Sequence, residues 1–356
     1  MFSKSLFAGV ILRCILICAS FTGAHGQIPE YYSQVNLDLR GNELQKELSW
    51  LVTNTHIREL LFTPEVWTAL KMADLDPDDT TKVLLIYGYD DNDGLIINDR
   101  TRGVNDNCTQ SDCSGLWNRE HVVARSQTMP PMGTTGAGAD VHNLRAIDSD
   151  MNNHRGNRKF AAGEGEDSYV LSSGEFFPGD EWKGDVARIL MYMYLRYGAR
   201  ALPEFAATGN KNFDPEGVML DLLLLWNAED SVSAIEIKRN EVFEKMQGNR
   251  NPFIDNPYLA TLIWGGPNAE NKWEITSTDE ANKVTIQVYP NPVGETLFIK
   301  GLKDPAFYYE IYDMTGLKIS FGKNSNAISL SNYSPAVYTL RIVDQNQTHL
   351  IKFIKY

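Results

Sequence analysis

The chain of 356 residues is poor in the side chains that build thiolate and imidazole metal sites, with four cysteines and six histidines. Cys14 and Cys18 fall in an apolar run near the N-terminus, which leaves Cys108 and Cys113. No second cysteine pair or nearby histidine completes the ligands of a structural zinc site, and an H-E-x-x-H pattern is absent. These absences disfavour a zinc hydrolase. Cys108 and Cys113 form either a disulfide, if the chain is exported, or two free thiols.

Positive charge is also scarce. The formal net charge is −13 and the isoelectric point is about 5.0, whereas a protein that binds a polyanion is usually basic. The overall charge thus argues against a nucleic-acid partner. Residues 116–160 nevertheless contain six Lys or Arg and four Asp or Glu, a local net charge of +2. This stretch is suited to a phosphate group, and the acidic remainder predicts weak, salt-sensitive binding.

The N-terminus has the pattern of a signal peptide. A basic start precedes an apolar stretch over residues 6–19, and Ala24 and Gly26 supply small residues for cleavage. The pattern predicts that residues 1–26 are removed on export. A buried first helix and a membrane anchor are the alternatives, but Arg13 interrupts a run that is already short for a bilayer. We expect no transmembrane segment in the rest of the chain.

Composition divides the remaining chain into two folded parts. We expect a helix-rich α+β domain over residues 27–266, a polar linker over 267–284 and a small all-β sandwich over 285–356. In the first part, hydrophobic periodicity predicts mostly helical structure over residues 27–75, a strand over 82–89, and helices over 186–197, 218–226 and 234–246.

Two short segments carry residues suited to phosphate chemistry. Glu120 and His121 are adjacent, and at the end of a strand both side chains can face one pocket. Asn152 and Arg155 are three apart and share a face if they are helical. Carboxylate and amide oxygens suit Mg²⁺ or Ca²⁺, and an unligated histidine can act as a general base. With an arginine for the phosphate, these groups suffice for phosphodiester hydrolysis.

These motifs resemble the endonuclease I family of extracellular and periplasmic nucleases. The matching pieces, in order, are WNREHV at 117–122, D-x-HNL at 140–144, N-x-x-R-x-N at 152–157, KGDVAR at 183–188 and GNRNPFID at 248–255. The resemblance implies a ββα-metal (His-Me finger) core within an α+β fold. It also implies cleavage of DNA, and of RNA as well, with little sequence preference.

The resemblance assigns roles to individual residues. It implies that His121 is the general base that activates water and that Glu120 and Asn152 hold a single Mg²⁺, with Ca²⁺ or Mn²⁺ as alternatives. Arg155 is expected to contact the phosphate at the catalytic site. Further candidates for substrate binding are Arg119, Arg145 and Arg188, the last of which can equally pair with a carboxylate.

Other polar residues in the motifs are interpreted as structural. One base is enough for the reaction, so His142 is expected to be packed and hydrogen-bonded. Asp140 and Asp148 are expected to cap or brace the site rather than bind metal. Residues 248–255 are interpreted as scaffold, because their Asn and Arg side chains can satisfy buried carbonyl groups.

The C-terminal module resembles the sorting domain of the type IX secretion system. The resemblance rests on VYPNPV at 288–293, DMTG at 313–316 and KFIKY at 352–356. It implies a partnership with the secretion machinery and a secreted or outer-membrane-surface location. The alternative is a β-sandwich that binds carbohydrate or protein.

These observations predict a secreted, metal-dependent endonuclease, expected as a monomer, with DNA and RNA as substrates. The alternative is an exported nuclease-like protein that binds or adheres without turnover. Loss of the base or of a metal ligand would favour that alternative, but His121, Glu120 and Asn152 are all present.

Overall fold

The structure is a computed structural model that describes residues 27–273, 275, 286–302, 307–314, 317–344 and 347–356. The chain separates into two compact units, one ending at Ile275 and one beginning at Thr276. The predicted signal peptide lies outside the described residues, as do positions 276–284 of the predicted linker. Within the described ranges, no helix is long and apolar enough to cross a membrane.

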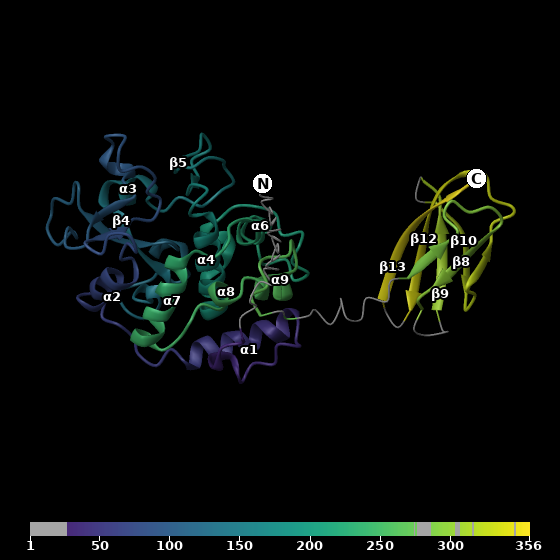
Figure 1. Cartoon of the computed structure of the whole chain (residues 1–356), viewed down its shortest axis with the longest axis horizontal. Helices are drawn as coiled ribbons and strands as arrows, with labels where there is room; N and C mark the ends of the chain where they lie inside the picture. The colour runs from purple at the N-terminus through teal and green to yellow at the C-terminus, as the bar shows by residue number, and fades with distance from the viewer. Residues whose placement is uncertain (1–26, 274, 276–285, 303–306, 315–316, 345–346) are drawn as a thin grey trace, which may run out of the picture. The chain divides into compact units, whose positions relative to one another are not determined.

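The first unit combines helices with small antiparallel strand pairs, which confirms the predicted α+β class. Its helices are α1 (Gly41–Asn54), α2 (Glu65–Ala73), α3 (Ser149–Arg155), α4 (Lys183–Tyr197), α5 (Pro203–Ala206), α6 (Asp221–Glu229), α7 (Ala234–Gln247), α8 (Pro252–Asp255) and α9 (Tyr258–Trp264) (Figure 1). Its strand pairs are β1 (Lys82–Leu84) with β2 (Thr101–Gly103), β3 (Trp117–His121) with β4 (Leu144–Asp148), and β5 (Tyr169–Val170) with β6 (Phe176–Phe177). Short 3-10 helices are η1 (Glu30–Tyr32), η2 (Ile96–Asn98), η3 (Arg125–Gln127), η4 (Gly136–Gly138), η5 (Val141–Asn143) and η6 (Gly198–Ala201).

Helix α4 belongs to the larger hydrophobic core of this unit. It packs against α1, α6, α8 and η5, so it is enclosed by neighbours and buries side chains around most of its circumference. Val186, Leu190 and Tyr192 are at most 1% exposed. The helix predicted over residues 186–197 is therefore confirmed, as is that over 234–246, which corresponds to α7. The helix predicted over 218–226 is present but begins and ends three residues later, since α6 runs from Asp221 to Glu229.

The prediction of a single strand over residues 82–89 is wrong beyond Leu84. The chain leaves the ladder with β2 there, and Tyr87 adopts a positive φ of 68°. A non-glycine residue in this conformation is costly and needs support from its surroundings. The N–H of Ile86 donates to the carbonyl of Ala146 at 2.8 Å, which ties this bend to β4.

The predicted linker over residues 267–284 is wrong in its first part. Trp273 is 8% exposed, and its ring centroid lies 4.7 Å from that of Tyr32. The hydroxyl of Thr261 donates to the carbonyl of Pro267 at 3.0 Å. These residues belong to the first unit, because a large aromatic ring in a polar stretch finds an apolar surface to cover.

The second unit is an all-β sandwich, as predicted. One sheet has the order β10-β9-β12-β13 and the other β11-β8-β7. Side chains from both sheets, among them Leu297, Ile311 and Leu340, form one buried cluster. The strands are β7 (Gln287–Tyr289), β8 (Thr296–Lys300), β9 (Phe307–Tyr312), β10 (Lys318–Lys323), β11 (Ala327–Ser329), β12 (Ala336–Asp344) and β13 (Gln347–Lys355) (Figure 1).

Candidate active site

The candidate site is built on the hairpin-like pair of β3 and β4 and on helix α3, which follows β4 directly. Glu120 lies opposite Arg145, and His121 lies opposite Leu144 in the antiparallel register. Asp148 begins α3 as its N-cap, with Oδ1 accepting from the backbone N–H of Asp150 at 2.8 Å and of Met151 at 2.9 Å. Asp148 therefore braces the junction between strand and helix, as expected.

Three predicted site residues come together at one open cavity of about 460 Å³, called here the active-site cavity. Glu120 and His121 reach it from the end of β3, and Asn152 reaches it from α3. Within a strand, successive side chains such as those of Glu120 and His121 point to opposite faces. His121 is the last residue of β3, where this alternation need not hold, so both side chains can reach one cavity. The lining residues are Arg119, Glu120, His121, Ala124, Arg125, Ser126, Pro131, Met132, Asn152 and Gly156.

The carboxylate of Glu120 is held by two neighbours. Its Oε1 accepts from the hydroxyl of Tyr87 at 3.1 Å and lies 3.1 Å from Nη1 of Arg155. Burial raises the pKa of Glu120 to about 7, although Arg155 and Tyr87 oppose the rise. Among the described residues, no hydrogen bond reaches its Oε2. One oxygen is thus fixed by the protein, and the other remains available to a ligand.

His121 is oriented by a backbone carbonyl and by an aromatic ring. Its Nε2 lies 2.8 Å from the carbonyl oxygen of Gly138, and its ring stacks on Phe62 at 5.5 Å between centroids. A carbonyl only accepts, so Nε2 carries the proton and Nδ1 keeps its lone pair. Burial lowers the pKa of His121 to about 4. The imidazole is therefore neutral at neutral pH, as a general base must be.

Asn152 completes a donor set of hard oxygen ligands. Its half-buried side chain lines the active-site cavity and makes no hydrogen bond to any described residue. A free amide beside a carboxylate with one free oxygen suits a small divalent cation that keeps several waters. No group of three His, Cys, Asp or Glu in the described part of the chain could hold a metal. Glu120 and Asn152 are the two residues of the predicted metal site, and both line this cavity.

Arg155 does not line the active-site cavity, so the expectation that it contacts the phosphate is wrong. It is 0% exposed, because α3 turns it toward the strands. Its Nη1 donates to the carbonyl of His121 at 3.0 Å, and its Nη2 donates to that of Val122 at 2.7 Å. Together with its ion pair to Glu120, these bonds make Arg155 a residue that positions the end of β3.

Two arginines line the cavity: Arg119, which was predicted to bind substrate, and Arg125, which the sequence motifs did not single out. Arg119 stacks its guanidinium between Phe62 and Trp67, at 3.7 Å and 4.1 Å from the ring centroids, and donates to the carbonyl of Phe62. Exposed Arg125 bonds through Nε to the carbonyl of Met132 at 2.9 Å. Arg125 lies four residues after His121 in the locally basic stretch 116–160, and this position was the sequence signal for a phosphate-binding role.

Arg145 and Arg188 are both 0% exposed, which excludes the predicted contact with substrate. Arg145 pairs with Asp185, and its Nε lies 3.4 Å from Asp74. Arg188 donates through Nε to Glu236 at 2.6 Å, so the second of its two expected roles is confirmed. Buried charges need partners, and these arginines join strand β4 to helices α4 and α7.

His142 and Asp140 have structural roles, as predicted. His142 is 3% exposed, and its Nε2 lies 3.2 Å from the carbonyl of Asn249. Asp140 is 1% exposed and accepts from the hydroxyls of Tyr192 and Tyr197, each at 2.8 Å. Asn249 in turn donates to the carbonyl of Val52 at 3.1 Å. The motif at 248–255 therefore satisfies buried carbonyl groups.

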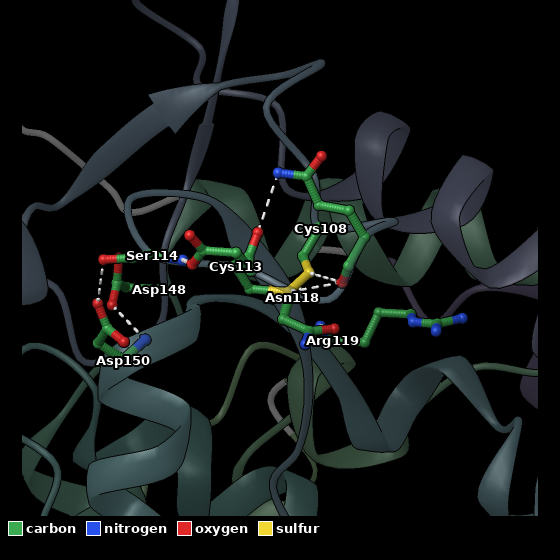
Figure 2. Close-up of a disulfide and its surroundings, with 9 residues drawn as sticks. Cys108, Cys113, Ser114, Asn118, Arg119, Asp148 and Asp150 are labelled. Atoms are coloured by element: carbon green, nitrogen blue, oxygen red, sulfur yellow. Dashed lines mark hydrogen bonds between the residues drawn. A yellow bond between two sulfur atoms is a disulfide. The ribbon is translucent and has the colours of Figure 1, made fainter.

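Cys108 and Cys113 form a disulfide, with Cα atoms 5.3 Å apart. Figure 2 shows this bond beside the N-terminus of α3, where the hydroxyl of Ser114 donates to Asp150 at 3.1 Å. The N–H of Cys108 also donates to the carbonyl of Trp117 at 2.8 Å. The disulfide loop thus braces the strand and the helix that carry the candidate site.

Two family models and two curated relatives match this chain. The model of the family described as Endonuclease I matches residues 40–258, and that of the Secretion system C-terminal sorting domain matches residues 287–356. The chain is 38% identical over 236 residues to an "Extracellular ribonuclease" of Bacillus subtilis (strain 168), covering 63% of this chain and 75% of that protein. It is 40% identical over 212 residues to an "Extracellular ribonuclease" of Bacillus amyloliquefaciens, covering 56% and 67%.

These likenesses support a nuclease that is secreted or placed on the cell surface. The chain belongs to the endonuclease I family and carries a C-terminal secretion sorting domain.

Proposed function

We propose that the protein is a metal-dependent endonuclease that hydrolyses phosphodiester bonds of RNA and DNA with little sequence preference. The observation that supports this proposal best is the meeting of Glu120, His121 and Asn152 at one cavity. Strands β3 and β4 with helix α3 would then form its ββα-metal core. The printed names of the two relatives are those of ribonucleases, so RNA is the first substrate to test.

His121 is proposed as the general base. The Gly138 carbonyl holds the Nε2 proton and leaves the Nδ1 lone pair to take a proton from water. That water's oxygen bonds to phosphorus while the bond from phosphorus to the leaving sugar oxygen breaks. General-base catalysis of this kind contributes roughly 10²–10⁴-fold to a rate.

Glu120 and Asn152 are proposed to hold one divalent cation, Mg²⁺ first and Ca²⁺ or Mn²⁺ as alternatives. When bound, such an ion stabilises the negative charge that develops on the phosphate and on the leaving oxygen. The fit rests on the free Oε2 of Glu120 and on the Asn152 amide, which bonds to no described residue. Tyr87 and Arg155 keep the carboxylate in place through its other oxygen.

Arg119 and Arg125 are proposed to bind the phosphate. Both line the cavity, and both guanidinium groups are fixed by backbone carbonyls. Fixed donors orient a phosphate at a smaller entropic cost than free side chains would. The donors face a group that every nucleotide shares, so they select the backbone rather than the base.

The test is incubation of the purified, processed protein with RNA, single-stranded DNA and plasmid, with chelator and after return of Mg²⁺. His121→Ala should lower turnover about 10²–10⁴-fold. His154→Ala is the matched control, because His154 is an exposed histidine on α3 that does not line the cavity. Normal turnover by His121→Ala, or full activity in chelator, would reject the mechanism. Binding of nucleic acid without any cleavage would favour an exported binding protein instead.

A further inference from the structure

A second cavity adjoins the active-site cavity and is unexplained by the chemistry above. It has a volume of about 310 Å³ and shares Ser126 with the active-site cavity. We call it the flank cavity, and its lining residues are Ser126, Gln127, Thr128, Met129, Asn157, Lys159 and Phe205. If a polynucleotide places one phosphate in the active-site cavity, the neighbouring nucleotide therefore lies beside the flank cavity.

The flank cavity offers an apolar wall. Met129 is 70% exposed, an unusual state for a large apolar side chain, and Phe205 is partly exposed on α5. Flat ring faces stack on phenyl rings and contact thioether sulfur favourably. The N–H of Met129 donates to the carbonyl of Arg200 at 2.9 Å, so the backbone that presents this side chain is held in place.

Two polar side chains also line the flank cavity, and one of them, Asn157, contacts the residue that both cavities share. Asn157 donates through Nδ2 to the hydroxyl of Ser126 at 3.2 Å, and its Oδ1 bonds to no described residue. Lys159 uses one ammonium N–H on the carbonyl of Glu204 at 2.6 Å. The ammonium group has two further donors. The flank cavity thus supplies, besides its apolar wall, an amide for the edge of a ring and an ammonium group for a neighbouring phosphate.

We propose that the flank cavity binds the nucleobase of a nucleotide next to the scissile phosphate, stacked on Met129 and Phe205. This inference rests on the proposed function, because it takes the polynucleotide chain to cross the active-site cavity. Stacking accepts every base, since each has a π face. The subsite therefore raises affinity for single-stranded substrate without imposing a sequence.

The proposal is tested by comparing two substrates that differ in the nucleobase. One is a short single-stranded RNA, and the other is bis(4-nitrophenyl) phosphate, a phosphodiester without a base. Met129→Ala combined with Phe205→Ala should lower kcat/KM for RNA about tenfold more than for the small diester. Phe205→Tyr keeps the aromatic ring, so this variant should keep most of the preference for RNA over the small diester.

Trp50→Ala is the matched control. Trp50 is 56% exposed and lines a different cavity with residues of α1 and α4. Its removal tests whether the loss of any exposed apolar side chain produces the same effect, and we expect the ratio of the two activities to stay unchanged. Equal losses on both substrates for the Met129 and Phe205 variants would overturn the subsite.

A binding measurement separates failure of the subsite from failure of the proposed function. His121→Ala protein, with chelator, is titrated with a single-stranded oligonucleotide and with its abasic counterpart. We expect about tenfold tighter binding of the base-bearing strand, and a loss of this preference when Met129→Ala and Phe205→Ala are combined. Equal affinity for both strands would overturn the subsite even if the enzyme cleaves RNA. A preference for bases without any turnover by the unaltered protein would sustain the subsite and refute the catalytic proposal.

Discussion

The imidazole of His121 and the carbonyl of Gly138 lie 2.8 Å apart, and this contact decides which ring nitrogen can take a proton. Gly138 ends η4, in the connection between the two strands of the site. Two residues further along, Asp140 is anchored by accepting from the hydroxyls of Tyr192 and Tyr197. The base is therefore oriented by the strand connection and not by its own strand alone.

Substitution of Gly138 should disturb this contact without touching His121. A Cβ at Gly138 would lie 2.0 Å from the carbonyl oxygen of Gly133, so the backbone must move. We expect Gly138→Ala to lower kcat for RNA cleavage about tenfold or more, because the displaced carbonyl no longer holds Nε2–H. Steady-state kinetics, with circular dichroism as a check on folding, measure the effect.

Gly133→Ala supplies the control in the same connection. A Cβ at Gly133 has nothing within 4 Å, so the variant should keep the kcat of the unaltered protein. If both variants were equally active, the Gly138 carbonyl would not be needed to orient the base.

Arg125 is expected to add one cation to the binding of nucleic acid. In a His121→Ala background, Arg125→Ala should weaken binding of single-stranded oligonucleotides at low salt. The slope of log affinity against log salt should fall by about 0.7, the contribution of one phosphate contact on a single strand. Fluorescence anisotropy between low and physiological salt gives the slope. Lys245→Ala, at an exposed cation on α7, should change neither quantity; an identical slope for Arg125→Ala would remove Arg125 from the binding surface.

Much of this site follows from the sequence, for reasons that individual residues make clear. The meeting of Glu120, His121 and Asn152 at one cavity was predictable, because short motifs keep their spacing on one strand and one helix. The roles of Arg145 and Arg155 were not, because an arginine in a motif serves a phosphate or a buried carboxylate equally well. Only tertiary packing distinguishes these roles, and it buries both side chains.

The same limit applied to residues far from the motifs. Phe62 and Gly138 contact the imidazole of His121. Both belong to segments whose sequence pattern indicates no catalytic role. Tyr87 reaches Glu120 only because the chain bends at a positive φ where the apolar run predicted a continuous strand. Composition likewise did not predict the end of the first unit, because tertiary contacts such as the packing of Trp273 on Tyr32 set this boundary.

The ends of RNA products should report the nucleophile. Attack by water leaves an open phosphate monoester, whereas attack by the ribose 2′-hydroxyl leaves a 2′,3′-cyclic phosphate. With His121 activating water, we expect no cyclic ends, and 2′-O-methyl RNA should be cut within about tenfold of the rate of ordinary RNA. Mass spectrometry of early products distinguishes the two. Cyclic ends, together with resistance of the 2′-O-methyl strand, would rule out water as the nucleophile.

The buried ion-pair network should make stability depend on pH. Burial and the negative charge of Glu236 raise the pKa of Asp185 to about 8, against the pull of Arg145. The folded state therefore keeps a proton that the unfolded chain releases near pH 4. The contribution of the Asp185 proton to the free energy of unfolding is fully present below about pH 4. It is lost as the pH rises through about 8.

Asp185→Asn should remove this contribution. The free energy of unfolding of the unaltered protein should fall relative to that of Asp185→Asn as the pH rises from about 4 toward about 8. Denaturant unfolding of both proteins across this range measures the difference. A difference that stays constant with pH would show that Asp185 is ionised in the folded state throughout.

The division into two units predicts that catalysis and export separate. The first unit ends at Ile275 and contains every residue of the active-site cavity and of the flank cavity. Deletion of residues 276–356 should leave the purified protein with a kcat/KM for RNA within about twofold of the full-length value, because no described side chain of the site is removed. The same deletion should stop delivery to the medium or cell surface, since the sorting domain occupies residues 287–356. Nuclease assays on the purified truncation and on cell fractions measure both effects. A purified truncation that folds but does not cleave RNA would show that the second unit takes part in catalysis.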